Sequence, residues 1–248
     1  MHKISIRFYE ELNDFLPEEK QKLRFEHSYI DRTSVKDLIE SLGVPHAEVD
    51  LILINGKSVG FDYLINDDDD ISVYPVFESI DITDLQHLRP KPLREPKFVA
   101  DVHLGRLTRY MRMLGFDTLY KNNIDDDEIV NISVDEKRTI LTRDRNILKI
   151  SAVTHGYFVR NIEIKKQLIE ILNRFNLKNQ IKEFTRCMGC NSRLESVTKE
   201  EIIDKLPPKV SESQEFFSIC PGCKKIYWKG THHHEMNAFI QSLKNSDY

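Results

Sequence analysis

The stretch PKFVADVHLGRLTRYMRMLGFDTLY, residues 96–120, carries the pattern that decides the fold of the central region. Apolar residues 98–100 predict a short buried strand that ends at Asp101. Residues 103–115 predict a helix closed by a glycine, and residues 116–120 predict another strand. A strand, a helix and a strand in succession indicate parallel strands with a helix packed on their sheet.

The same alternation continues further along the chain. RTILTRD, residues 138–144, predicts a strand that ends at Asp144, and GYFVR, residues 156–160, predicts another. Helices are expected after the acidic run at 125–127 and over KKQLIEILNRFN, residues 165–176. We therefore predict an α/β fold whose parallel sheet is flanked by helices.

The residues before this region predict a smaller domain. Ile4, Ile6 and Phe8 alternate with polar residues, as a half-buried strand requires. Strand, strand, helix, strand, strand is the predicted order, which is that of a β-grasp fold. The expected division of the chain is 1–80 for the β-grasp domain, 81–96 for a proline-containing linker, 97–183 for the α/β domain and 184–248 for a cysteine-containing domain.

The composition indicates a globular protein. The formal net charge is −4 over 248 residues, so nucleic-acid binding would have to come from local basic patches. No apolar run reaches the roughly 20 residues that a membrane span needs. The N-terminus lacks the apolar core of a secretion signal. We therefore expect a cytoplasmic protein that does not associate with membranes.

Aspartates stand at the ends of two predicted strands and at the start of a predicted helix. Asp101 and Asp144 each follow an apolar strand, and residues 125–127 are all aspartate. Ligands of parallel sheets bind beyond the carboxyl ends of the strands, so these side chains are candidates to converge there. Two unit charges 4 Å apart repel by about 4 kcal/mol at an effective dielectric constant of 20, which a cation would relieve. Magnesium or manganese suits such oxygen ligands and can promote phosphodiester hydrolysis.

Each aspartate also has a structural interpretation. Asp101 is suited to cap the helix that follows it, and Asp144 is suited to a turn. In the acidic run we interpret Asp125 as the helix cap. Asp127, with Asp126 next, is the favoured candidate for catalysis.

Arginines lie close to these acids in the sequence. Their planar guanidinium groups suit phosphate oxygens, which favours an RNA backbone as the partner. The alternative is a solvated helix face paired with local acids. The candidate RNA-binding residues are Arg106, Arg109, Arg112, Arg143 and Arg145.

The four cysteines form two CxxC pairs, Cys187 with Cys190 and Cys220 with Cys223. Four thiolates in this pattern typically bind one structural zinc ion in tetrahedral geometry. A redox pair or free thiols are the alternatives. The three histidines at 232–234 are interpreted as a polar helix start, since four cysteines already satisfy zinc.

Tyr227 and Trp228 follow the second cysteine pair. Packing around the zinc-binding loop is the favoured interpretation of these aromatic residues. A platform on which RNA bases stack is the alternative.

Several segments resemble, in this order, the Mut-seven C-terminal ribonuclease domain family: FVADVHLGRLTRYMRMLGFDTLY, DDDE, RTILTRDRNIL, RCMGCN and CPGCKKIYWKGTH. The resemblance covers about residues 97–236 and implies a PIN-like fold with an appended zinc ribbon. It also implies that Asp101, an acid of the 126–127 pair and Asp144 bind the catalytic metal. KDLIESLGVPHAEVDLILINGKSV and VYPVFES resemble the ubiquitin-like domain that often precedes this family, which is similar to sulfur carriers of thiamin and molybdopterin synthesis.

Two features depart from these resemblances. PIN-like nucleases often carry a fourth acid after a later strand, where this sequence has Arg160 and Asn161. Sulfur carriers end in an exposed Gly-Gly, whereas residues 75–78 here continue into the next domain. The N-terminal domain is therefore interpreted as a binding module for the substrate or for a protein partner.

The leading hypothesis is a ribonuclease that uses magnesium or manganese to hydrolyse RNA. The second is a non-catalytic RNA- or ribosome-associated protein, which would share the zinc ribbon and the basic patch. The third is an adaptor in sulfur or cofactor metabolism, which the missing Gly-Gly disfavours.

Overall fold

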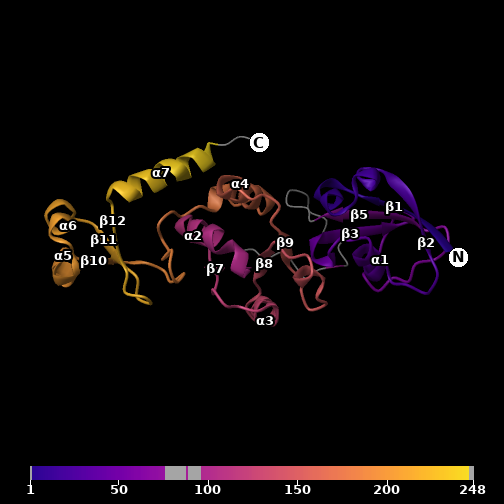
Figure 1. The fold of residues 1–248 in the computed structure, drawn as a ribbon, viewed down its shortest axis with the longest axis horizontal. Coiled ribbons are helices and arrows are strands. Elements are labelled where there is room, and N and C mark those ends of the chain that lie inside the picture. Colours follow the sequence, from indigo (N-terminus) through magenta and orange to yellow (C-terminus); the bar gives the residue numbers. More distant parts are fainter. Residues whose placement is uncertain (1, 76–87, 89–95, 246–248) are drawn as a thin grey trace. The chain divides into compact units, whose positions relative to one another are not determined.

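The structure, a computed structural model, describes residues 2–75, 88 and 96–245. The predicted linker at 81–96 lies outside this part of the chain except for residues 88 and 96. Figure 1 shows the helices and strands along the chain. The chain divides into two compact units: one holds residues 1–95 and 125–158, and the other holds residues 96–124 and 159–248.

The first unit begins with a five-stranded sheet in the order β2-β1-β5-β3-β4. Strand β1 is antiparallel to β2 and parallel to β5, and β3 is antiparallel to β5. A mixed sheet with one α-helix among the described residues confirms the predicted β-grasp fold. Its strands and α-helix are β1 (His2–Phe8), β2 (Arg24–Tyr29), α1 (Val35–Ser41), β3 (Val49–Ile54), β4 (Lys57–Ser58) and β5 (Asp70–Pro75). The 3-10 helices η1 (Glu10–Phe15), η2 (Glu18–Lys20) and η3 (His46–Glu48) lie between them.

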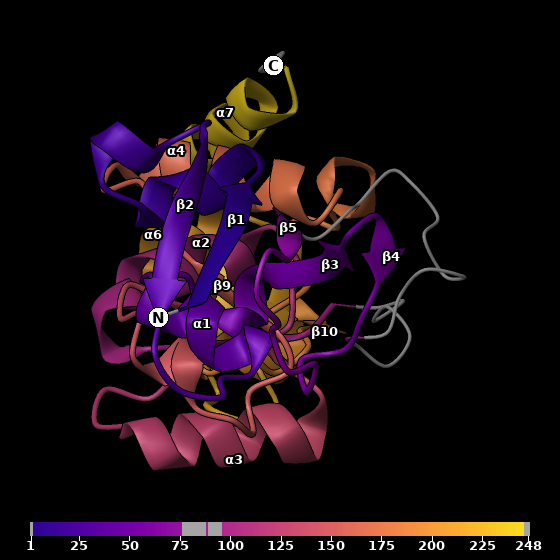
Figure 2. The same cartoon turned by 90° about the vertical axis from the view of Figure 1, so that its right-hand side faces the viewer.

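The alternation of β1 explains how this sheet buries one face. Ile4, Ile6 and Phe8 are buried and share a core with Leu38 and Ile39 of α1. Helix α1 packs against that face of the sheet, and Figure 2 shows α1, β1 and β2 from the right-hand side of Figure 1. Burying five such side chains contributes about 1.5–3 kcal/mol each relative to leaving them exposed, which is enough to hold the helix in place.

The first unit also contains residues 125–158. Helix α3 (Asp126–Glu136) is followed by β8 (Thr139–Thr142), the short 3-10 helix η6 (Ile147–Lys149) and β9 (Gly156–Phe158). Strands β8 and β9 are parallel. Asp125 caps α3 as predicted, because its carboxylate accepts the N–H of Glu128 at 2.8 Å.

Residues 147–158 pack against the β-grasp sheet and its loops within this unit. His46 Nε2 lies 2.9 Å from the Val153 carbonyl oxygen, and Lys149 donates to the Glu40 carbonyl at 2.9 Å. Glu48, which is fully buried, accepts the backbone N–H of Phe158. A buried carboxylate is retained only where such donors satisfy it, so these bonds fix the two segments together.

The second unit begins with β6 (Phe98–Ala100), which is parallel to β7 (Thr118–Leu119). Helix α2 (Gly105–Met113) connects them and packs against α4 (Ile164–Arg174). Strands β6 and β7 belong to a four-stranded sheet whose strand order is β7-β6-β8-β9 and which is flanked by helices. This order confirms the predicted α/β fold. The apolar stripe of Leu104, Leu107, Met111 and Leu114 is buried as the helical spacing predicts.

The second unit ends in a small antiparallel sheet in the order β10-β11-β12. Its core consists of Ile202, Leu206 and Phe217, with Trp228 packed against it. A core this small supplies little stability alone, so a bound metal would add much of it. The elements are β10 (Glu195–Val197), α5 (Lys199–Ile202), η8 (Ile203–Lys205), α6 (Pro208–Ser213), β11 (Phe217–Ile219), β12 (Ile226–Trp228) and α7 (Thr231–Lys244). Across the described residues, the chain forms no helix with the length and apolar character of a membrane span.

Candidate metal centre and candidate catalytic acids

The two CxxC pairs form two loops with the same backbone hydrogen bonds. In each loop the carbonyl of the first cysteine accepts the N–H four residues later. The N–H of that cysteine donates to the carbonyl five residues later. The N–H groups of Asn191 and Lys224 donate to the carbonyls of Cys187 and Cys220. The N–H groups of Cys187 and Cys220 donate to the carbonyls of Ser192 and Lys225. All four bonds are 2.8–2.9 Å long.

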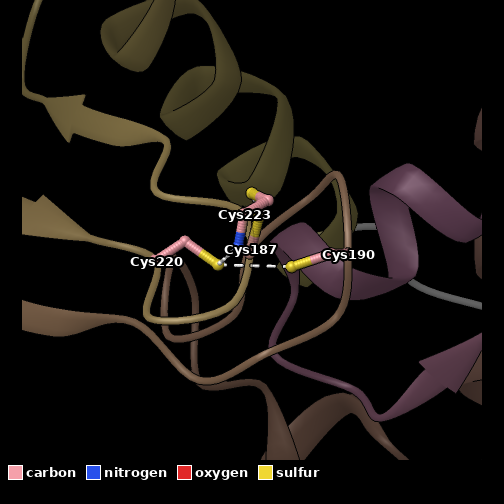
Figure 3. Close-up of side chains that lie close together, drawn as sticks. All are labelled: Cys187, Cys190, Cys220 and Cys223. Atoms are coloured by element: carbon pink, nitrogen blue, oxygen red, sulfur yellow. Dashed lines mark hydrogen bonds between the residues drawn. The ribbon is translucent and has the colours of Figure 1, made fainter.

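These loops bring all four sulfur atoms within 4.8 Å of one another. The Sγ atoms of Cys190 and Cys220 are 3.2 Å apart, and those of Cys187 and Cys223 are 3.5 Å apart. Figure 3 shows the side chains of Cys190 and Cys220 facing each other. Zinc–sulfur bonds of about 2.3 Å in a tetrahedron require sulfur separations of about 3.8 Å, so a small outward movement lets the group hold zinc.

The ionisation of the thiols supports the need for a cation. Burial opposes the ionisation of Cys190, but hydrogen bonds from Ser192 lower its pKa to about 6. The backbone N–H of Lys225 favours the Cys223 thiolate, but burial and the three neighbouring thiols raise the pKa of Cys223 to about 12. A cation that offsets the repulsion between the sulfur atoms would favour the thiolate form of all four cysteines.

Tyr227 contacts this centre directly. Its hydroxyl oxygen lies 3.1 Å from Cys187 Sγ. Trp228 packs on the small core of the same sheet. Tyr227 therefore packs against the cysteine loops, as favoured from the sequence, whereas Trp228 packs on the apolar core of the sheet. His232 is exposed and lies 3.6 Å from Glu235 in the first turn of α7.

Arg112 joins helix α2 to the first cysteine loop. Its guanidinium donates to the carbonyl oxygens of Thr118 at 2.8 Å and Gly189 at 2.6 Å. The side chain is buried, whereas Arg106 and Arg109 are exposed. Each three-residue step along a helix rotates a side chain back by about 60°, so two steps carry Arg112 about 120° away from Arg106. Arg112 therefore does not share the exposed face of the helix with Arg106 and Arg109.

We predict that Arg112→Ala lowers the free energy of unfolding by about 3 kcal/mol, because buried carbonyls lose a charged donor. Urea unfolding of the zinc-loaded protein measures the change. Arg109→Ala on the exposed face serves as the matched control and should change stability by less than about 0.5 kcal/mol. Equal stability of the two variants would contradict the assigned role of Arg112.

The candidate catalytic acids lie at the predicted strand and helix ends. Asp101 follows β6, is buried, and accepts the N–H of His103 at 2.8 Å. Asp144 lies beyond the end of β8, is exposed, and accepts the N–H of Asn146 at 2.8 Å. A carboxylate has about four acceptor positions, and these backbone bonds hold the two carboxyl groups in place.

Asp126 and Asp127 are exposed in the first turn of α3. They share the first unit with Asp144, whereas Asp101 belongs to the second unit. In the described parts of the chain, the four cysteines make up the one group of three or more metal-ligating side chains whose donor atoms lie within 4.8 Å. The convergence of the acids stays a prediction.

The two arginines beside Asp144 have different surroundings. Arg143 is half-buried. The Arg145 guanidinium lies 5.0 Å from the ring centroid of Phe15 and 5.3 Å from that of Phe158. A cation above two aromatic rings is held by their electron-rich faces. Arg145 therefore links the Asp144 loop to the β-grasp domain.

Glu170 is a residue that the sequence gave no reason to select. Its carboxylate accepts the backbone N–H groups of Arg160 at 2.8 Å and Asn161 at 3.0 Å, and the Asn161 amide at 2.6 Å. It thus brings a carboxylate from α4 to the segment where the sequence lacks the expected fourth acid. A polar residue on a surface helix carries no local signal of such a contact.

The fold and the cysteine centre together define a class: a parallel α/β domain with a four-cysteine ribbon, preceded by a β-grasp domain. Two family models match the chain. The Mut7-C RNAse domain model matches residues 96–240, and the Mut7-C ubiquitin model matches residues 1–81. The chain belongs to the Mut7-C RNAse domain family. Comparisons with curated proteins and with solved structures gave no match.

Proposed function

We propose that this protein is a metal-dependent ribonuclease that hydrolyses phosphodiester bonds in RNA. Membership of the Mut7-C RNAse domain family is the observation that carries this proposal. Asp101 and Asp144 follow β6 and β8, which are neighbours in the strand order of the sheet. Side chains beyond the carboxyl ends of neighbouring parallel strands commonly form one ligand site.

In this proposal Asp101, Asp144 and one or both of Asp126 and Asp127 hold magnesium or manganese. The ion would activate water and stabilise the charge that develops on the phosphate. The chain's own part is to fix these carboxylates, and the backbone bonds to the Asp101 and Asp144 carboxylates do so before any ion arrives. Such preorganisation reduces the cost of assembling like charges.

The proposed contacts to the RNA backbone come from Arg106, Arg109 and Arg143. Arg106 and Arg109 are exposed on α2, the helix that follows Asp101, and Arg143 adjoins Asp144. We assign Arg112 and Arg145 to the fold because carbonyl oxygens and aromatic rings engage their guanidinium groups. We also propose that the cysteine centre holds structural zinc and that the protein works in the reducing cytoplasm, where unbridged thiols persist.

The test is cleavage of labelled RNA by the zinc-loaded protein, with and without added manganese or magnesium. We expect the added ion to raise the cleavage rate at least about 100-fold, since it supplies both the nucleophile and charge stabilisation. Salt-sensitive RNA binding without metal-stimulated cleavage would instead support the second candidate, a non-catalytic RNA-binding protein. The exposed arginines of α2 favour RNA binding in either case.

A further inference from the structure

The cysteine-containing sheet borders a pocket that no part of the proposed reaction uses. Its volume is about 790 Å³, and its walls come from β10, β11, β12, the first turns of α7 and the segment before the first cysteine loop. Pockets of about 300–1,000 Å³ suit small planar ligands and short chain segments. The pocket lies wholly within the second unit.

Aromatic side chains line this pocket. Phe216 is 75% exposed, which is unusual for a large apolar residue, and Trp228 is half-exposed. Phe184 and His233 are packed together with ring centroids 4.3 Å apart and an interplanar angle of 33°. Flat aromatic surfaces of this kind bind the faces of nucleobases without regard to sequence.

The charges along the pocket are mostly paired. Lys199 lies 3.0 Å from Glu215, and Glu183 lies 3.3 Å from Lys244. A nearly neutral wall suits an uncharged base better than a bare phosphate. The Lys229 ammonium is exposed and lies 5.8 Å from the Phe216 ring centroid, so it can meet the phosphate attached to a base stacked on that ring.

His233 provides a polar group at the same wall. Its Nδ1 is buried and makes no hydrogen bond to the described residues. Burial is the main cause that lowers the pKa of His233, which keeps its imidazole neutral. A neutral ring nitrogen without a protein partner is an unused donor or acceptor, and rotation of the side chain toward the pocket would offer it to the edge of a base.

From these observations we propose that this pocket binds unpaired bases of single-stranded RNA, with Phe216 and Trp228 as stacking surfaces and Lys229 on the backbone. The inference deepens the proposed function, on which it rests for the identity of the ligand. Duplex RNA keeps its base faces stacked inside the helix and would not fill this pocket. The pocket would then favour single-stranded RNA over duplex RNA.

The test measures binding of a labelled, unstructured oligoribonucleotide of about 10 nucleotides to the full-length, zinc-loaded protein, without added magnesium or manganese. Phe216→Ala should weaken binding about tenfold, because one stacking surface is lost. Phe216→Tyr should retain the affinity. Ile203→Ala is the matched control because Ile203 is also an exposed apolar residue of the ribbon but does not line the pocket.

The outcomes separate this inference from the proposed function. Binding that depends on Phe216 supports the pocket even if added manganese produces no cleavage. Metal-stimulated cleavage with unchanged affinity in Phe216→Ala would overturn the pocket and leave the ribonuclease proposal intact. Equal affinity for single-stranded and duplex RNA would also overturn the proposal that the pocket binds unpaired bases. A protein segment would then be the better candidate ligand of the pocket.

Discussion

Asp101→Asn is expected to lower the rate of RNA cleavage at least about 100-fold, because it removes one negative ligand from the proposed metal site. The asparagine side chain keeps the oxygen that accepts the His103 N–H, so the local fold should survive. A circular dichroism spectrum and a thermal unfolding curve like those of the parent protein would confirm that survival. Cleavage of labelled RNA with manganese measures the effect.

Asp125→Asn is the matched control for this variant. Asp125 lies in the acidic run but acts as the N-cap of α3, and asparagine caps helices as well as aspartate does. Its activity should therefore stay within about threefold of the parent, since a cap shapes the helix end and not the metal site. Full activity in a purified Asp101→Asn protein would contradict the catalytic assignment.

Cys220→Ser is expected to abolish stable zinc binding and to unfold the ribbon. The buried Cys220 lies 3.2 Å from Cys190, so the loss leaves an incomplete ligand set beside a very small core. Structural zinc contributes about 10–16 kcal/mol of binding free energy in small zinc-binding units, and a folded ribbon depends on that contribution. The zinc content measured by metal analysis should fall from one ion per chain toward none.

Thermal unfolding gives the second measurement for this variant. Loss of the ribbon should appear as a separate transition at lower temperature, with the β-grasp domain retained. Ser218→Ala, in the same strand β11, controls for substitution in this sheet and should keep its zinc. A Cys220→Ser protein with a full complement of tightly bound zinc would contradict the four-cysteine centre.

Local residue chemistry explains which features the sequence predicts well. Asp125 caps α3 because its short carboxylate reaches a free N–H at a helix start. Asn55 and Gly56 both adopt positive φ angles, 50° and 78°, as an Asn-Gly turn between two antiparallel strands such as β3 and β4 requires. The CxxC spacing likewise predicts the two cysteine loops, and the fold then brings the sulfur atoms of the two loops together.

Contacts between distant residues explain what the sequence does not reveal. His46 meets Val153, which lies 107 residues later, and no local pattern encodes that pairing. Arg112 shares the three-residue spacing of Arg106 and Arg109, yet the rotation of the helix buries it against the first cysteine loop. Glu170 likewise bonds to Arg160 and Asn161, which precede it by 10 and 9 residues and lie before the helix that carries it. Such side chains are identified only when tertiary packing is known.

The most direct test is a crystal structure of the protein soaked with manganese, with the ion located by its anomalous scattering. The ribonuclease account predicts a manganese ion bound by carboxylate oxygens of both Asp101 and Asp144, at distances close to the roughly 2.0–2.1 Å of magnesium sites. Carboxyl groups of Asp101 and Asp144 too far apart to share an ion, with no manganese bound by either, would contradict it.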